Sequence, residues 1–198
     1  MNKTEYRVKT ITDLSELDQV YNLAVSVLGN LDHTGHTLFF YREHAQLTPS
    51  LLIYVEQDGK VIGCVLGSID EDHVLVGPVA VATEKRRMGV GTAMMQQIEK
   101  EAKSLGQTTL ILGALQEAEG FYVQCGYRPN LLIQFPETGQ AEPLKQLNRK
   151  YPIIWEAEEG KWTRIMLATL QVDRELQEAY EKKFPSCNTQ YVFIKEIG

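Results

Sequence analysis

Cysteine is scarce in this chain, which has three in 198 residues. Cys64, Cys125 and Cys187 lie far apart, form no C-x-x-C pair and have no histidine at the spacing of a zinc site. The sequence therefore predicts neither a disulfide framework nor a metal centre. Unpaired cysteines are typical of a reducing compartment, so we expect a cytoplasmic location.

Long apolar runs are also missing. No stretch approaches the ~20 apolar residues that cross a bilayer, and the polar start MNKTEYRVKT is unlike a signal peptide. We therefore expect no membrane association. With 43% hydrophobic and 23% charged residues, the composition is typical of a globular protein.

Positive charge is in deficit, with 20 Lys and Arg against 26 Asp and Glu and a net charge of −6. An acidic chain without a basic-aromatic pattern is a poor nucleic-acid binder, so we expect no nucleic-acid partner. Its negative field weakly favours a cationic partner, such as a polyamine, an aminoglycoside or a peptide amine.

The most informative segment that is present runs from Val79 to Thr92 and reads VAVATEKRRMGVGT. An apolar run typical of a buried strand is followed by basic residues, by Arg86-x-x-Gly89-x-Gly91 and by a helix. Such a turn aims backbone N–H groups at one point, at the positive end of the helix dipole. Glycine lets a ligand approach the backbone. Two glycines at a strand–helix turn also serve packing alone, so the hexapeptide by itself leaves a structural turn and an anion site open.

The flanking segments favour the anion site. His73 to Val81 is a nearly continuous apolar run, typical of a strand buried on both faces. Gly77-Pro78 interrupts it and predicts a bulge that frees backbone groups for a ligand. The helix that follows has an apolar face and ends at Gly106; that face comprises Met94, Ile98, Ala102 and Leu105.

Other elements are expected by pattern. Asp13 with Glu16 predicts a capping box, for a helix that ends at Gly29. Gln57-Asp58-Gly59 predicts a hairpin. Further strands are expected over 6–11, 51–56, 60–67 and 107–112, and short helices over 38–46 and 116–125. The stretch 30–35 is expected to be a loop, and 135–143 a turn-rich connector. Residues 153–156 and 162–168, a helix after Asp173 and residues 191–195 predict a ββαβ-like extension.

Two motifs in order carry a family resemblance. The first is Gly77-Pro78-Val-Ala-Val81 with Arg86, Gly89 and Gly91. The second is Ala118-x-x-Phe121-Tyr122-x-x-x-Gly126-Tyr127. The chain resembles the GNAT superfamily of acetyl-coenzyme A-dependent N-acetyltransferases, whose signatures are G-P-L-A-V before R/Q-x-x-G-x-G/A, then N-x-x-A-x-x-F-Y-x-x-x-G-F/Y. It departs from them at Leu115, where the family often has Asn, and at Thr83, where it often has Pro.

The resemblance implies an α/β fold with a mixed, mostly antiparallel central sheet flanked by helices. Residues 1–130 would form the acetyl-coenzyme A-binding catalytic domain. Residues 131–198 would form the C-terminal extension, which could extend the sheet, cover the acceptor site or mediate dimerisation. Neither the oligomeric state nor the acceptor follows from the sequence.

The resemblance also implies roles for residues. The pantetheine arm would pair with the backbone of Val79 and Val81, while Tyr122 would protonate the departing thiolate. A phenol has a pKa of ~10 and is protonated at neutral pH. The coenzyme pyrophosphate would be bound by Arg86, Arg87, Met88, Gly89, Val90, Gly91 and Thr92.

The general base is harder to predict. Glu71 and His73 are candidates, because the family often places a carboxylate on or near the central strand, although the composition favours a solvated acidic turn between two strands. Tyr41, Glu43 and His44 lie where the family builds its acceptor pocket. The expected reaction is acetyl transfer to a primary amine by direct attack in a ternary complex. The alternative is a non-catalytic acyl-coenzyme A-binding sensor or scaffold.

Overall fold

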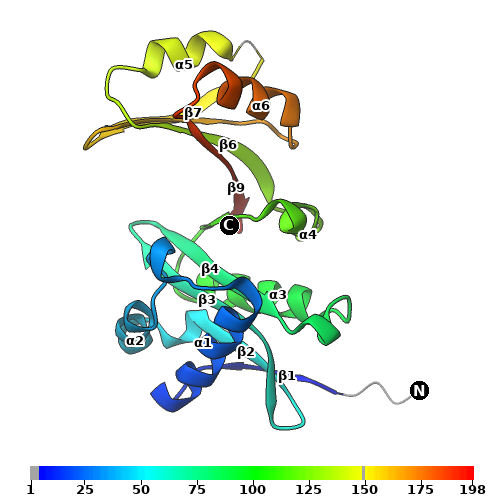
Figure 1. Cartoon of the computed structure of the whole chain (residues 1–198). Coiled ribbons are helices and arrows are strands. Elements are labelled where there is room, and N and C mark those ends of the chain that lie inside the picture. Colours follow the sequence, from blue (N-terminus) through cyan, green and yellow to red (C-terminus); the bar gives the residue numbers. More distant parts are fainter. Residues whose placement is uncertain (1–4, 149) are drawn as a thin grey trace. The chain divides into compact units, whose positions relative to one another are not determined.

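The computed structural model describes residues 5–148 and 150–198, which form two compact units (Figure 1). The first unit runs to Ile111 and also includes Glu196–Gly198. The second unit is Leu112–Lys195. The domains expected over 1–130 and 131–198 stay a prediction.

The first unit contains a sheet with helices on both faces (Figure 1). Strands β1–β4 pair antiparallel in chain order. The start of β5 pairs with β4 in parallel. Its strands are β1 (Arg7–Thr10), β2 (Leu52–Gln57), β3 (Lys60–Asp70), β4 (His73–Val81) and the first three residues of β5 (Thr109–Gly113), and its α-helices are α1 (Leu14–Leu28), α2 (Leu38–Leu47) and α3 (Val90–Ser104). Short 3-10 turns cover Asp32–Thr34, Pro49–Leu51 and Thr83–Lys85.

Successive residues of β3 point to opposite faces of this sheet, and their contacts show which helix covers each face. Cys64 and Leu66 pack in one core cluster with Leu17, Val20 and other α1 residues. A Cβ added to Gly63 or Gly67 would instead meet Val90, Met94 or Ile98 of α3. Helices α1 and α3 therefore cover opposite faces, as the period-2 geometry of a strand requires.

The second unit combines four antiparallel strands, in the order β9-β6-β8-β7, with three helices. Its elements are α4 (Glu119–Gln124), β6 (Arg128–Phe135), α5 (Ala141–Leu147), β7 (Ile153–Glu159), β8 (Trp162–Leu167), α6 (Arg174–Lys183) and β9 (Asn188–Glu196), with a 3-10 turn at Gln116–Ala118. Helices α5 and α6 lie on the same side of the strands (Figure 1). The Tyr180 hydroxyl of α6 donates to the Leu144 carbonyl of α5 at 2.8 Å.

The expected fold class is confirmed, since the chain is mixed α/β with mostly antiparallel strands flanked by helices. The expected ββαβ order is present as β7, β8, α6 and β9. Three local expectations were wrong. Leu105 is 40% exposed, because α3 ends there and Gly106 turns away at φ +77°. The connector expected over 135–143 gives way to α5 at Ala141, and residues 30–35 include a 3-10 turn.

Candidate functional site

The glycine motif forms the turn between β4 and α3. Arg87 has φ +63° and Gly89 has φ +81°, so the backbone takes two left-handed steps before the helix. Arg86, Arg87 and Met88 are exposed, whereas Val90 is buried and fixes the first turn of α3 on the sheet. This stretch can therefore meet a ligand with its backbone and its charges.

The start of α3 differs from the starts of three other helices. Asp13, Thr37 and Asp173 each accept a hydrogen bond from a backbone N–H at the start of α1, α2 and α6. The N-cap of α3 is Gly89, and no side chain among the described residues caps this helix. The first N–H groups of a helix have no partner within the helix, so those of α3 are available to an anion.

The predicted bulge in β4 is present. Val79 pairs with Val65, but Val76 pairs with Gly67, so β4 contains one residue more than β3 across Gly77-Pro78. Contrary to the expectation of a strand buried on both faces, β4 alternates buried and half-buried residues, because helices cover its faces unequally.

Beyond the bulge, β4 has an open edge. Its pairing with β5 covers only Val74 and Leu75 among the described residues. Val79 and Val81 pair with β3 on the other side. An extended ligand could therefore add to this edge in the way that peptides add to exposed strands. All the residues predicted to bind the coenzyme lie in the first unit.

Tyr122 lies in the second unit, on α4. It is 6% exposed and contacts three aromatic rings of the same unit, those of Phe121, Tyr127 and Phe193, at centroid distances of 5.2–6.2 Å. This burial, and secondarily the Cys125 thiol, raises the pKa of Tyr122 well above its ordinary value. The phenol therefore stays protonated, as a proton donor requires.

The two base candidates lie at the turn between β3 and β4. Glu71 is exposed at φ +52°. His73 pairs with Asp70, and its Nδ1 lies 3.4 Å from the Asp72 carboxylate. Four residues of strand, about 13 Å, separate His73 from Gly77. The roles of both residues stay predictions.

Sequence reasoning missed one half-buried group beside the bulge. His36 Nδ1 lies 2.8 Å from the Tyr41 hydroxyl. The Tyr41 hydroxyl in turn reaches the Leu66 carbonyl opposite the bulge, at 3.5 Å. The histidine stands in an exposed-looking Thr-Gly-His-Thr stretch, so no pattern in the sequence indicates it.

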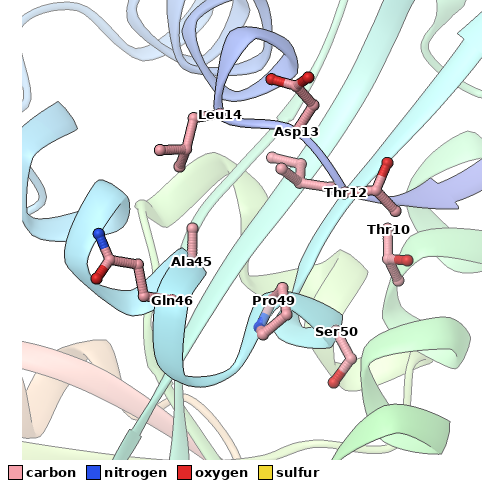
Figure 2. Close-up of a pocket in the computed structure, with 9 residues that line it drawn as sticks. Thr10, Thr12, Asp13, Leu14, Ala45, Gln46, Pro49 and Ser50 are labelled. Atoms are coloured by element: carbon pink, nitrogen blue, oxygen red, sulfur yellow. The ribbon is translucent and has the colours of Figure 1, made fainter.

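A pocket of about 420 Å³ lies elsewhere in the first unit, between the start of α1 and the end of α2 (Figure 2). Thr10, Asp13, Ala45 and Pro49 are among the residues that line it. The Asp13 carboxylate is occupied in capping α1, where it accepts from the Ser15 N–H at 2.8 Å. None of the predicted coenzyme or catalytic residues lines this pocket.

No helix in the described ranges, 5–148 and 150–198, is long and apolar enough to span a bilayer. Within the same ranges, Cys64, Cys125 and Cys187 form no disulfide bond.

Known proteins are similar to this chain at three levels. The model of the acetyltransferase (GNAT) family matches residues 17–127. An uncharacterized N-acetyltransferase of Methanocaldococcus jannaschii is 32% identical over 114 residues, which are 54% of this chain and 73% of that protein.

Solved structures share the fold at low identity. A GNAT-family acetyltransferase from Staphylococcus aureus superimposes with a TM-score of 0.59 at 10% identity, covering 98% of this chain and 100% of that one. One from Elizabethkingia anophelis, with acetyl-CoA bound, gives 0.52 at 16% identity, covering 83% and 97%. The family model spans more than half of the chain and includes both motifs, so the chain belongs to the GNAT family of acetyltransferases.

Proposed function

We propose that this protein transfers an acetyl group from acetyl-coenzyme A to a primary amine. The observation that carries the proposal is the turn between β4 and α3, in which Arg86 and Arg87 precede a helix start that no side chain among the described residues caps. Family membership and the acetyl-CoA bound to the Elizabethkingia neighbour support the choice of donor.

In this proposal the protein binds the coenzyme through backbone groups of β4 and of the turn before α3. The N–H groups of Arg87 to Thr92 bind the pyrophosphate, and the basic side chains offset its charge. The pantetheine arm pairs with the open edge of β4 at Val79 and Val81. The thioester then lies toward Gly77, where the strand is interrupted.

The acceptor amine attacks the thioester carbonyl directly, within a ternary complex. A backbone N–H near Val79 or Val81 polarises the carbonyl. Tyr122 protonates the departing thiolate. Direct attack needs no covalent intermediate on Cys125, which is the C-cap of α4.

Charge reversal at the turn tests the donor site. Arg86→Glu should weaken acetyl-coenzyme A binding at least tenfold by repulsion, and Gly89→Asp should abolish it by placing a carboxylate against the pyrophosphate. Isothermal titration calorimetry measures both. Lys100→Glu changes the net charge equally on the exposed side of α3 and is the control. Normal binding by both variants would contradict the site.

A second candidate function is a coenzyme A-binding sensor without catalysis. It is favoured by Leu115, which is 58% exposed where the family often has a coenzyme-contacting Asn. Release of free thiol from acetyl-coenzyme A in the presence of amines separates the two functions, because a sensor binds the coenzyme but releases no thiol.

A further inference from the structure

The bulge in β4 is contacted by a pair of side chains from outside the strand. Tyr41, on α2, is fully buried, and its hydroxyl is 2.8 Å from Nδ1 of the half-buried His36. The two rings are nearly parallel, with an interplanar angle of 9°. The Tyr21 hydroxyl of α1 donates to the His36 carbonyl at 3.1 Å. Both the ring and the backbone of His36 are therefore positioned.

The absence of a side chain at Gly77 lets the Tyr41 hydroxyl and His36 come close to the β4 backbone. A Cβ at position 77 would overlap the Tyr41 hydroxyl and would lie 2.7 Å from the Leu66 carbonyl oxygen and 3.1 Å from His36 Nδ1. The three polar atoms thus surround the position that a side chain at the bulge would fill. Glycine at this position is required by close approach and not by a left-handed backbone.

The Tyr41 hydroxyl has one proton and two neighbours. The Leu66 carbonyl can only accept, so Tyr41 must donate to it if that 3.5 Å contact is made. The 2.8 Å contact between the Tyr41 hydroxyl and His36 Nδ1 fits either direction of donation, and in the tautomer with the proton on Nδ1 it is His36 that donates to Tyr41. In this tautomer Nε2 has a free lone pair. No hydrogen bond to Nε2 is formed by the residues that the structure describes.

We propose that His36 is the general base of the reaction, with Tyr41 as the positioning residue that fixes its tautomer. The inference rests on the proposed function, which places the thioester beside Gly77. In this proposal, an amine that attacks there approaches the bulge from the face that carries His36, whose Nδ1 would lie 3.1 Å from a Cβ at position 77.

Each proton in the proposed step has a defined donor and acceptor. The neutral amine nitrogen forms a bond to the carbonyl carbon, and the bond between that carbon and sulfur breaks. The proton that nitrogen loses passes to His36 Nε2. The thiolate receives a proton from Tyr122 and leaves as the thiol. His36 then gives its proton to water, and Tyr122 regains one from water.

The surroundings of His36 favour its neutral form. Burial lowers the pKa of His36 below its ordinary value. The titratable groups around it are the hydroxyls of Tyr41 and Tyr21, with Cys64 next to Tyr41 and Asp32 next to Tyr21. A base with a lowered pKa is unprotonated at pH 7, so activity should fall only as the pH drops through this value.

The test is thiol release from acetyl-coenzyme A with spermidine, kanamycin or a peptide with a free N-terminal amine. His36→Ala should lower kcat about 100-fold or more while leaving coenzyme binding intact. Added imidazole should restore part of the lost rate. The acidic limb in the pH profile of kcat should disappear in the variant. Arg42→Ala, on the exposed side of α2, is the matched control.

A second measurement does not depend on turnover. Nitrogen NMR of the wild-type protein should show the His36 proton on Nδ1, and Tyr41→Phe should shift the population toward the Nε2-protonated form. Rescue of His36→Ala by imidazole separates a base from a merely structural histidine.

The outcomes separate the two proposals. If the wild-type protein releases no thiol with any of the three amines, the proposed function fails, and this inference with it. If the wild type is active but His36→Ala is equally active, only the inference is overturned. The same holds if Glu71→Gln or His73→Ala loses the acidic limb and His36→Ala keeps it.

Discussion

Burial shifts the pKa values of three side chains with roles in the proposed reaction. Tyr122 and Tyr41 are both buried phenols whose pKa is raised by loss of water, while His36 is an imidazole whose pKa is lowered by the same cause. Burial always disfavours the charged form, which is the anion of a phenol and the cation of an imidazole. One physical effect therefore prepares one group to donate a proton and another to accept one.

Tyr122→Phe should bind acetyl-coenzyme A normally but lower kcat about 100-fold, because only the hydroxyl is removed. Since the pKa of Tyr122 is raised, its ionisation should cause no loss of wild-type activity below about pH 10. Steady-state kinetics across pH measures both effects. Tyr151→Phe, at another half-buried tyrosine of the second unit, is the control. Unchanged turnover in Tyr122→Phe would remove this residue from the mechanism.

Helix starts differ in their capping. Helices α1, α2 and α6 have side-chain caps, whereas α3 and the short helices α4 and α5 have none among the described residues. An Asp13 cap was predictable from its spacing to Glu16, and the capping box is confirmed. The missing side-chain cap of α3 was equally predictable, because glycine at position 89 has no side chain that could accept a hydrogen bond.

Asp173 caps the start of α6. Its carboxylate accepts from the Leu176 N–H at 3.0 Å and from the Tyr151 hydroxyl at 2.7 Å. Asp173→Ala should lower the free energy of unfolding by about 1 kcal/mol, the usual effect of a lost cap. Urea denaturation followed by tryptophan fluorescence measures it, because Trp155 and Trp162 both lie in the second unit.

The effect should also depend on pH. The Leu176 N–H, then the Tyr151 hydroxyl, lower the pKa of Asp173 below that of the unfolded chain. The stabilisation is therefore full above about pH 4 and is lost as the pH falls through the lowered pKa. The stability difference between wild type and Asp173→Ala should shrink at pH 2–3. Glu178→Ala, exposed on the same helix, should show no such difference.

Elements with a strong local pattern were predictable, and those without one were not. The α1 cap, the hairpin at Asp58-Gly59 and the β4 bulge each follow from a few adjacent residues. Helix α5 has seven residues and buries only Leu144, so it has no apolar periodicity. Strand β6 was not anticipated because Pro129 interrupts its start.

The candidate site divides in the same way. The glycine turn and Tyr122 stand in motifs of adjacent residues and could be named from the sequence. His36 contacts Tyr41 and lies close to Gly77, and position 77 is distant from both in the sequence and meets them only in the fold. A contact of this kind leaves no periodicity or spacing to detect.

At the scale of the whole molecule, the chain leaves the first unit after Ile111 and returns to it at Glu196. Ile197 is 5% exposed, and its N–H donates to the Thr108 carbonyl at 2.8 Å. The Glu196 carboxylate accepts from the Thr109 hydroxyl at 2.9 Å. The last residues of the chain are therefore part of the first unit's structure.

Deletion of Ile197 and Gly198 should destabilise the first unit by about 2 kcal/mol, the contribution of one buried isoleucine. In urea, the far-UV circular dichroism transition should move to lower concentration ahead of the tryptophan transition, which reports the second unit. Deletion of Gly198 alone should change neither. Coincident shifts of both transitions would indicate instead that the two units unfold together.

The return of the chain at Glu196 also has a consequence for biosynthesis. A ribosome must add the 84 residues from Leu112 to Lys195 before it adds the segment that completes the first unit. At about 5–20 residues per second this takes roughly 4 to 17 seconds. During that interval the residues of the turn at Gly89 and of the bulge at Gly77 have been synthesised, whereas Ile197, which is buried in the same unit, has not. Synthesis of the unit proposed to bind coenzyme A thus begins before that of the second unit and ends after it.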